Sequence, residues 1–174
     1  MAEIESIRSA VTAGASSQGL RLEVEIGMSA VLFERLTTIC AGLFAGAALY
    51  ITFVEHPARL ECGTALAATV FGPSYRRATI MQASLAAIGL VSGLIAWGMG
   101  RGRAVLIGSV LLGLVVPFTL LIVFPTNKRL LDPGLDRNSD EARALLVRWG
   151  QLHGVRSLLS TLAFLILLWH LSAA

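Results

Sequence analysis

Charged side chains are scarce in this chain. Asp, Glu, Lys and Arg together make up 14% of its 174 residues, whereas about 25% is typical of soluble domains. Hydrophobic residues reach 55%, and the mean hydropathy is +0.74. So few charges cannot cover the surface of a compact domain in water. The composition therefore excludes an ordinary soluble protein and predicts a membrane protein.

The sequence also lacks a zinc-binding motif, a cluster of basic residues and a pair of cysteines placed to form a disulfide. Cys40 and Cys62 are more than roughly 20 Å apart by helical rise, which argues against a bond between them. No Cys or His spacing matches a zinc motif. The basic residues are dispersed, with no aromatic stripe between them, so we predict no nucleic-acid partner. Membrane lipid with anionic head groups explains the net charge of +3.

Four predominantly apolar stretches predict membrane spans. They cover residues 36–54, 78–100, 104–124 and 155–173. A helix of 19 residues rises about 28 Å, close to the hydrocarbon thickness of about 30 Å. Alternation typical of membrane strands is absent from all four stretches. We therefore predict an all-α fold, an integral membrane four-helix bundle of residues 31–174, with two long loops on one side.

Residues 1–30 differ from the rest of the chain. They are more polar, and we expect an N-terminal extension that is disordered or not native to the protein. The alternation of apolar and charged residues over 20–27 favours a short exposed strand. A basic start followed by an apolar centre is absent, so a signal peptide is not predicted. Met28 directly precedes the bundle and is a candidate start of the natural protein.

Charge counting orients the predicted spans. The loops at residues 55–77 and 125–154 fall on one side, and the tripeptide at 101–103 falls on the other. Nine of the fourteen basic residues lie on the side of the long loops, and cytoplasmic loops are usually the richer in Lys and Arg. We therefore predict a multi-pass protein of the plasma membrane whose long loops are cytoplasmic.

Polar residues gather at the same end of the predicted spans. His56 follows the first span, and Tyr75 and Arg76 precede the second. Gln82 comes seven residues after Tyr75, which places both on one helix face. Asn127 follows the third span two residues after Pro125, where an Asn commonly occupies a turn or a cap. These side chains are expected to meet at the level of the membrane surface.

The segment before the last span, WGQLHGVR, has a face of its own. Spacing of three, four and seven residues places together Trp149, Leu152, His153 and Arg156. Two neighbouring glycines, at 150 and 154, let another helix approach. We expect one membrane-level cavity to collect six side chains: His56, Tyr75, either Arg76 or Arg77, Asn127, His153 and Arg156.

The order of these motifs resembles one family. It comprises HPA after the first span, a Tyr-Arg pair before the second, PTNKRLL after the third and W-x-x-L-H-x-x-R before the fourth. The chain is in this respect similar to the anthrone-oxygenase-like family of small four-span membrane proteins, many without an assigned reaction. The resemblance covers about residues 30–174. It implies an oxygenase-like oxidoreductase without fixing its substrate. The best-known fungal members are associated with oxidising an anthrone to an anthraquinone with dioxygen.

The resemblance also implies a site. Its catalytic residues would be His56, Asn127, His153 and Arg156, and its substrate-binding residues Tyr75, Arg76 and Trp149. An anthrone must lose a proton before it reacts with dioxygen, so a neutral histidine can act as base while Arg156 stabilises the oxyanion. We expect a membrane-embedded oxygenase or oxidase acting on a small apolar aromatic, such as an anthrone or a hydroquinone.

Several alternatives stay open from the residues alone. The residues do not identify a cofactor. Either the protein has none, or His56 and His153 bind iron or copper. Glu55 and His56 are adjacent and point about 100° apart on a helix, which suits a shared ion poorly. A noncatalytic bundle that binds lipid, quinone or a partner membrane protein fits the same composition. Association into a homo-oligomer is compatible with either function.

Overall fold

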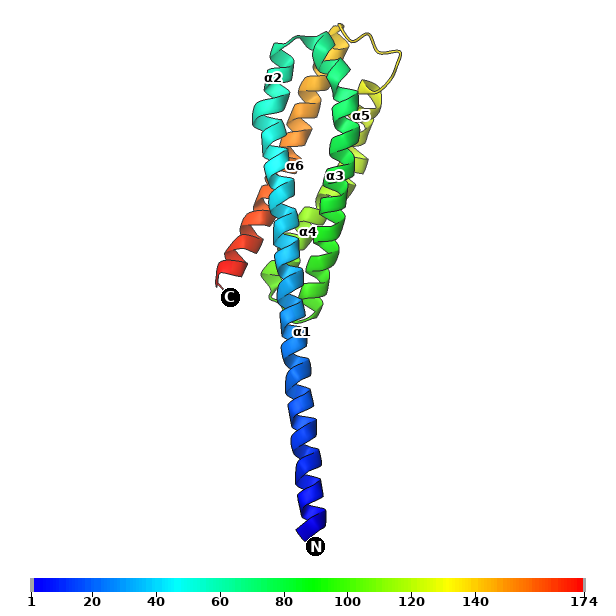
Figure 1. Cartoon of the computed structure of the whole chain (residues 1–174). Helices are drawn as coiled ribbons and strands as arrows, with labels where there is room; N and C mark the ends of the chain where they lie inside the picture. The colour runs from blue at the N-terminus through cyan, green and yellow to red at the C-terminus, as the bar shows by residue number, and fades with distance from the viewer. Residues whose placement is uncertain (1, 174) are drawn as a thin grey trace.

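In the computed structural model, most of the described chain is helical (Figure 1). The structure describes the backbone of residues 2–173 and the side chains of residues 18–173. No β-strand occurs within residues 2–173, so the all-α prediction is confirmed. The elements are α1 (Ala2–Tyr50), the π-helical segment η1 (Ile51–Glu55), α2 (His56–Glu61), α3 (Thr64–Gly98), α4 (Arg103–Phe118), the π-helical segment η2 (Thr119–Val123), α5 (Phe124–Leu130) and α6 (Asp140–Ala173).

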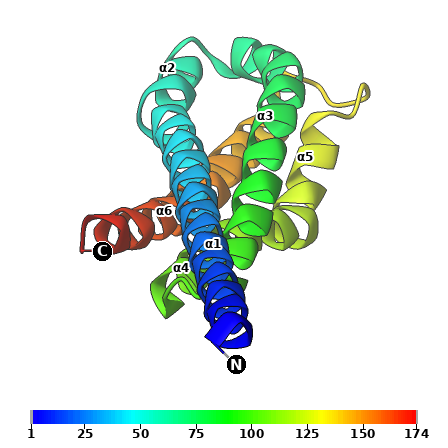
Figure 2. The same ribbon diagram turned by 60° about the horizontal axis from the view of Figure 1, so that its bottom comes forward.

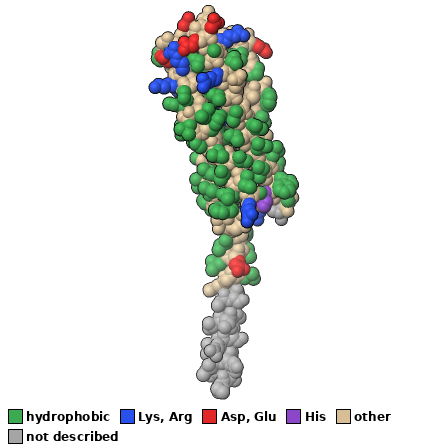
Figure 3. Space-filling model, turned by 180° about the vertical axis from the view of Figure 1, so that it is seen from behind, with side chains coloured by type: hydrophobic (Ala, Val, Ile, Leu, Met, Phe, Trp, Pro, Cys, Tyr) green, Lys and Arg blue, Asp and Glu red, His purple; other side chains and the backbone are tan. Residues whose placement is uncertain are grey.

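Four helical stretches are long and apolar enough to cross a membrane. They are Gln18–Glu61, Thr64–Gly98, Arg103–Leu130 and Asp140–Ala173. In Figure 3 hydrophobic side chains cover the middle of the molecule, while most acidic and basic side chains gather at one end. A band of this kind is typical of a surface that faces lipid. The four helices indicate a multi-pass membrane protein.

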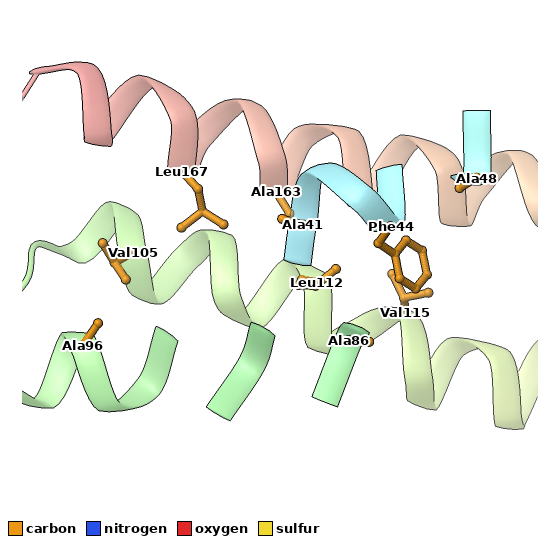
Figure 4. Packing of buried hydrophobic residues seen from close by; sticks show 10 residues of the cluster. All are labelled: Ala41, Phe44, Ala48, Ala86, Ala96, Val105, Leu112, Val115, Ala163 and Leu167. Carbon is orange, nitrogen blue, oxygen red and sulfur yellow. The ribbon is translucent and has the colours of Figure 1, made fainter. Parts of the chain in front are cut away.

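The bundle is a ring in which α1 and α4 each pack mainly against α3 and α6 (Figures 1 and 2). Small side chains allow this close approach. Figure 4 shows the core, which contains Ala41, Phe44, Ala48, Ala86, Ala96, Val105, Leu112, Val115, Ala163 and Leu167. A Cβ atom on Gly93 of α3 would collide with the Ser109 side chain of α4, so this contact depends on glycine.

Two prolines widen the helices that precede them. The segments η1 and η2 end two residues before Pro57 and Pro125. Proline has no N–H group, and its ring clashes with the carbonyl group four residues earlier in a regular α-helix. A π-helical turn removes this conflict and lets the helix continue. Both wide turns lie toward the charged end of the bundle, where the predicted polar residues are found.

The connections at the charged end are shorter than expected. The sequence predicts connections over residues 55–77 and 125–154, with a helix that restarts near Asn138, and only 62–63 and 131–139 lie outside helices. Because α6 begins at Asp140, the predicted restart is confirmed. Hydropathy detects only the apolar part of a helix. The helix itself continues into polar residues outside the membrane, because its hydrogen bonds are local and do not depend on apolar side chains. Ser139 begins α6 by accepting a hydrogen bond from the Ala142 amide at 3.1 Å. Both connections lie on one side, as predicted.

The start of the bundle also differs from expectation. Residues 20–27 belong to α1, so the predicted strand is wrong there. The helix protrudes beyond the bundle (Figure 1). Leu20, Val24 and Ile26 are exposed there. A strand needs a partner strand for its hydrogen bonds, whereas a helix makes its own. The side chains of residues 1–17 lie outside the described part, and a natural start at Met28 stays a prediction.

Candidate functional site

Two adjoining chambers lie inside the bundle, near the charged end. The outer chamber, of about 100 Å³, lies between α3 and the α4–η2 helix and is mostly apolar. The inner chamber, of about 20 Å³, is lined by residues of η1, α2, α3 and α6. Both are lined by Tyr75, Thr79, Gln82 and Arg156. These four residues therefore mark the junction between an apolar space and a polar one.

His153 lies in the inner chamber. It is 2% exposed, and the i, i+4 spacing on α6 brings its ring against Trp149, with 4.8 Å between ring centroids. Its Nδ1 atom is 3.1 Å from the Thr52 hydroxyl of η1. Because Nδ1 is hydrogen-bonded to Thr52, Nε2 is the ring nitrogen available to a molecule in the chamber.

Arg156 lines both chambers from the next turn of α6. Its side chain is 8% exposed, and Nη2 donates a 2.7 Å hydrogen bond to the Gln82 amide oxygen. The guanidinium carbon is 5.8 Å from the centre of the Phe44 ring. Its Nε has no hydrogen-bond partner, and no carboxylate of the described residues pairs with Arg156. A buried cation without a counter-charge favours an anion beside it.

Arg59 is a second guanidinium of the inner chamber that the sequence does not single out. It is 7% exposed, and its Nη2 is 2.6 Å from the Glu55 carboxylate, which also accepts a 3.2 Å hydrogen bond from Ser74. The i, i+4 spacing of Glu55 and Arg59 is the only sequence signal for this pair. Unlike Arg156, Arg59 has its own counter-charge.

Aromatic rings line one side of the inner chamber. Phe71 meets Trp149 edge to face at 5.4 Å and stacks on Tyr75 at 5.6 Å between centroids. Trp149 also contacts His56, with 5.1 Å between ring centroids. The Trp149 and Tyr75 side chains, predicted to bind substrate, thus lie at one cavity together with His153 and Arg156.

His56 lies behind this aromatic row and does not line either chamber. Neither ring nitrogen of His56 has a hydrogen-bond partner of good geometry, and the Leu146 carbonyl group makes only a weak interaction with the ring. A Cβ atom on Gly150 would be 2.6 Å from the His56 Nε2 atom, so the absent side chain gives the imidazole its space. At Gly154 the same position is open.

Asn127 and Arg76 lie away from the two chambers. Asn127 on α5 is fully buried, and neither atom of its amide group has a hydrogen-bond partner among the described residues. Arg76 is exposed on α3, where its Nε is 3.4 Å from the Gly72 carbonyl. The structure therefore brings four of the seven predicted site residues to one cavity and leaves His56, Asn127 and Arg76 outside it.

Metal ligands do not cluster in the part of the chain whose side chains are described. No group of three or more His, Cys, Asp and Glu residues there is arranged to share an ion. His56 and His153 each contact Trp149. Iron or copper bound through these two histidines stays a prediction, and the described residues supply no third His, Cys or carboxylate ligand beside them.

A separate buried charge cluster lies at the opposite end of the bundle. Glu34 of α1 is fully buried, and its carboxylate binds the Arg101 guanidinium from the α3–α4 turn. The His170 Nε2 atom of α6 is 3.6 Å from the other carboxylate oxygen. In the sequence His170 is isolated near the C-terminal end of the last predicted span, which favours a structural role, and nothing in the sequence indicates that Glu34 is buried.

The outer chamber opens on the side of the bundle. Thr79 and Ala83 of α3 and Val116, Leu120 and Phe124 on the opposite lip are exposed while lining the chamber. These residues lie within the apolar stretches of the two helices. An apolar molecule could therefore reach the chamber from lipid without crossing the charged end.

Comparisons with known proteins point to one family. The family model described as "Anthrone oxygenase" matches residues 71–166, more than half of the chain. Anthrone oxygenase tpcL of Aspergillus fumigatus is 46% identical over 63 residues, which cover 34% of this chain and 38% of that protein. The match thus spans less than half the length of this relative. No solved structure matches the chain.

Proposed function

This chain belongs to the anthrone oxygenase family, and on that premise we propose that it is a membrane-embedded oxygenase or oxidase for a small apolar aromatic, such as an anthrone or a hydroquinone. The observation that carries the proposal is the arrangement of α6. His153 and Arg156 are one turn apart, both are buried, and both line the inner chamber. A base and an unpaired cation beside an apolar chamber suit an acidic, lipid-soluble carbon acid.

The proposed reaction begins with loss of a proton from the methylene carbon of an anthrone. His153 accepts the proton at Nε2, and Arg156 stabilises the phenolate-like oxyanion that forms. Dioxygen then oxidises the methylene carbon by four electrons. One oxygen atom becomes the new carbonyl group of the anthraquinone, and the other leaves as water with the two methylene hydrogens.

The proposed route of entry is lateral. A flat aromatic dissolved in lipid would pass between Ala83 and Leu120 into the outer chamber, with its acidic carbon toward Arg156 and His153. We place the protein in the plasma membrane, with the α2–α3 and α5–α6 connections in the cytoplasm, on the distribution of Lys and Arg.

Dioxygen consumption by the purified protein in detergent tests the proposal. With an anthrone as substrate, we expect one dioxygen per anthraquinone, corrected for uncatalysed oxidation. His153→Ala should lower the rate by about 100-fold or more, because general bases contribute roughly 10²–10⁴. His170→Ala, at the other end of α6, is the matched control and should keep the wild-type rate. Equal rates in the two variants would remove His153 from the reaction.

Two further results with the same preparation separate the alternatives. Saturable anthraquinone binding without dioxygen consumption would identify a noncatalytic bundle. Stoichiometric iron or copper by elemental analysis, lost in His153→Ala and His56→Ala, would make these histidines ligands.

A further inference from the structure

Two hydroxyl groups connect His153 to the backbone of α1. The Thr52 Oγ1 atom is 3.1 Å from the His153 Nδ1 atom and 2.8 Å from the Ser157 Oγ atom. Ser157 Oγ is in turn 3.1 Å from the carbonyl oxygens of both Ala48 and His153. Ser157 is buried and Thr52 is half-buried. The chain of contacts therefore runs from the imidazole through two hydroxyl groups to main-chain carbonyls.

The far end of this chain fixes its direction. A carbonyl oxygen has no proton, so Ser157 is the donor in its contacts with Ala48 and His153. Each hydroxyl group has only one proton to donate. The 2.8 Å contact between the hydroxyls therefore uses the Thr52 proton. Thr52 is then left to accept from the imidazole, which requires a proton on Nδ1.

The opposite tautomer does not satisfy the same contacts. If Nδ1 carried the lone pair, Thr52 would have to donate to it. The 2.8 Å contact would then either lack a proton or take the proton of Ser157. Without a proton between them, the lone pairs of the Thr52 and Ser157 oxygens would face each other. With the Ser157 proton directed to Thr52, Ser157 would no longer donate to the carbonyl oxygens of Ala48 and His153.

Thr52 differs in this respect from other threonines of the bundle. Thr37, Thr38 and Thr119 each donate to the carbonyl oxygen four residues earlier. For Thr52 that carbonyl belongs to Ala48, and Ser157 of α6 occupies it instead. Thr52 is the second residue of the wide turn η1, and its hydroxyl group contacts His153 and Ser157 of α6.

We propose that Thr52 and Ser157 are positioning residues that hold His153 as the Nδ1-protonated tautomer, with the Nε2 lone pair available to the inner chamber. This inference rests on the proposed function, in which His153 is the base. When Nε2 takes the substrate proton, the Nδ1–H bond to Thr52 persists and keeps the ring in place. The second hydroxyl supplies the acceptor that keeps the Thr52 proton away from Nδ1.

Nitrogen NMR of ¹⁵N-histidine-labelled protein in detergent, without substrate, tests the inference. Spectra are taken at about pH 8, where imidazoles are usually neutral, and the His153 signals are those missing in His153→Ala. The wild type should have Nδ1 as the protonated nitrogen. Thr52→Val and Ser157→Ala should each raise the Nε2-protonated fraction several-fold. Thr52→Ser should restore the wild-type pattern. Thr38→Val, a buried threonine distant from the site, is the control.

Turnover gives a second readout with the same variants. Thr52→Val should lower kcat with little change in KM, and should cause no further loss when added to His153→Ala, because both act through one group. A wild-type His153 protonated on Nε2, or an unchanged tautomer in both Thr52→Val and Ser157→Ala, would overturn the inference. The NMR result needs no turnover. Failure of anthrone oxidation would therefore leave it intact and would count only against the proposed function.

Discussion

The two ends of the bundle both bury charged side chains, but they balance them differently. At the end near the protruding helix, Glu34 binds Arg101 and faces His170, so the acid has two basic neighbours. At the other end Arg156 lines a cavity and has a neutral amide, from Gln82, as its hydrogen-bond partner. The first cluster is complete within the protein. In the second, no carboxylate of the described residues pairs with Arg156.

This difference separates a structural role from a functional one. A closed set of opposite charges joins helices and gains nothing from a ligand. An unpaired guanidinium beside a cavity costs stability in the empty protein, and that cost is offset by whatever negative charge arrives or develops there. Breaking each cluster should therefore have opposite consequences for stability and for activity.

Among the substitutions that break these two clusters, Arg156→Gln should give the largest change in activity. Loss of one donor to a developing oxyanion costs roughly 10²–10³ in rate, and the melting temperature should not fall, because a buried unpaired charge is removed. Dioxygen consumption and thermal unfolding in detergent measure both quantities. Arg148→Gln, exposed on the same helix, is the control. A stability loss without an activity loss would assign Arg156 to structure.

Arg101→Leu should reverse this pattern. It leaves the Glu34 carboxylate buried without its guanidinium partner, which costs about 3–5 kcal/mol of unfolding free energy for a buried pair. The folded fraction should keep its activity, since the site lies at the other end. Chemical denaturation gives the stability. An unchanged denaturation midpoint would show that Glu34 is solvated or protonated in the protein.

Gly150→Ala should have an intermediate effect by crowding the His56 ring behind Trp149. The added methyl group would be 2.6 Å from His56 Nε2, and overpacking of this kind costs about 1–3 kcal/mol. Gly154→Ala on the same helix meets no atom within 4 Å and should stabilise by up to about 1 kcal/mol through helix propensity. Equal melting temperatures would mean that α6 is less closely packed on α2.

Asp132→Asn should have the smallest effect, and it tests the same chemistry in water. The Gly134 amide and the Arg129 guanidinium, bonded to this loop carboxylate, lower its pKa below the usual value. Its stabilising contribution is therefore present above the unfolded-state pKa and lost as pH falls through the folded-state value. Melting curves should differ slightly at neutral pH and coincide in acid. A larger difference than for Arg101→Leu would overturn the contrast between buried and exposed pairs.

The sequence predicts the part of the site that one helix encodes. Trp149, His153 and Arg156 meet in the cavity because helical periodicity fixes their common face locally. Tyr75 and Gln82 of α3 follow for the same reason. The all-α fold is predictable because uncharged stretches of span length leave few alternatives.

Contacts between distant helices are less accessible to sequence reasoning. Arg76 is exposed because packing sets the rotation of α3, and a run of two arginines carries no information about it. In the sequence Arg59 resembles any arginine at a membrane interface, and only the fold brings it to the wall of the inner chamber. The contact of Thr52 with Ser157 joins residues 105 positions apart. It depends on the wide turn η1, and the only sequence signal for that turn is the proline two residues beyond its end.

The side opening between α3 and α4 has a consequence for how any ligand would be measured. For a compound that enters through lipid, the occupancy of the chamber depends on the mole fraction of the compound in the bilayer and not on its molar concentration in buffer. The membrane then acts as a reservoir that concentrates apolar reactants and sets the occupancy of the protein. Extra protein-free vesicles would dilute such a substrate in two dimensions and slow turnover, although its total amount in the tube had not changed.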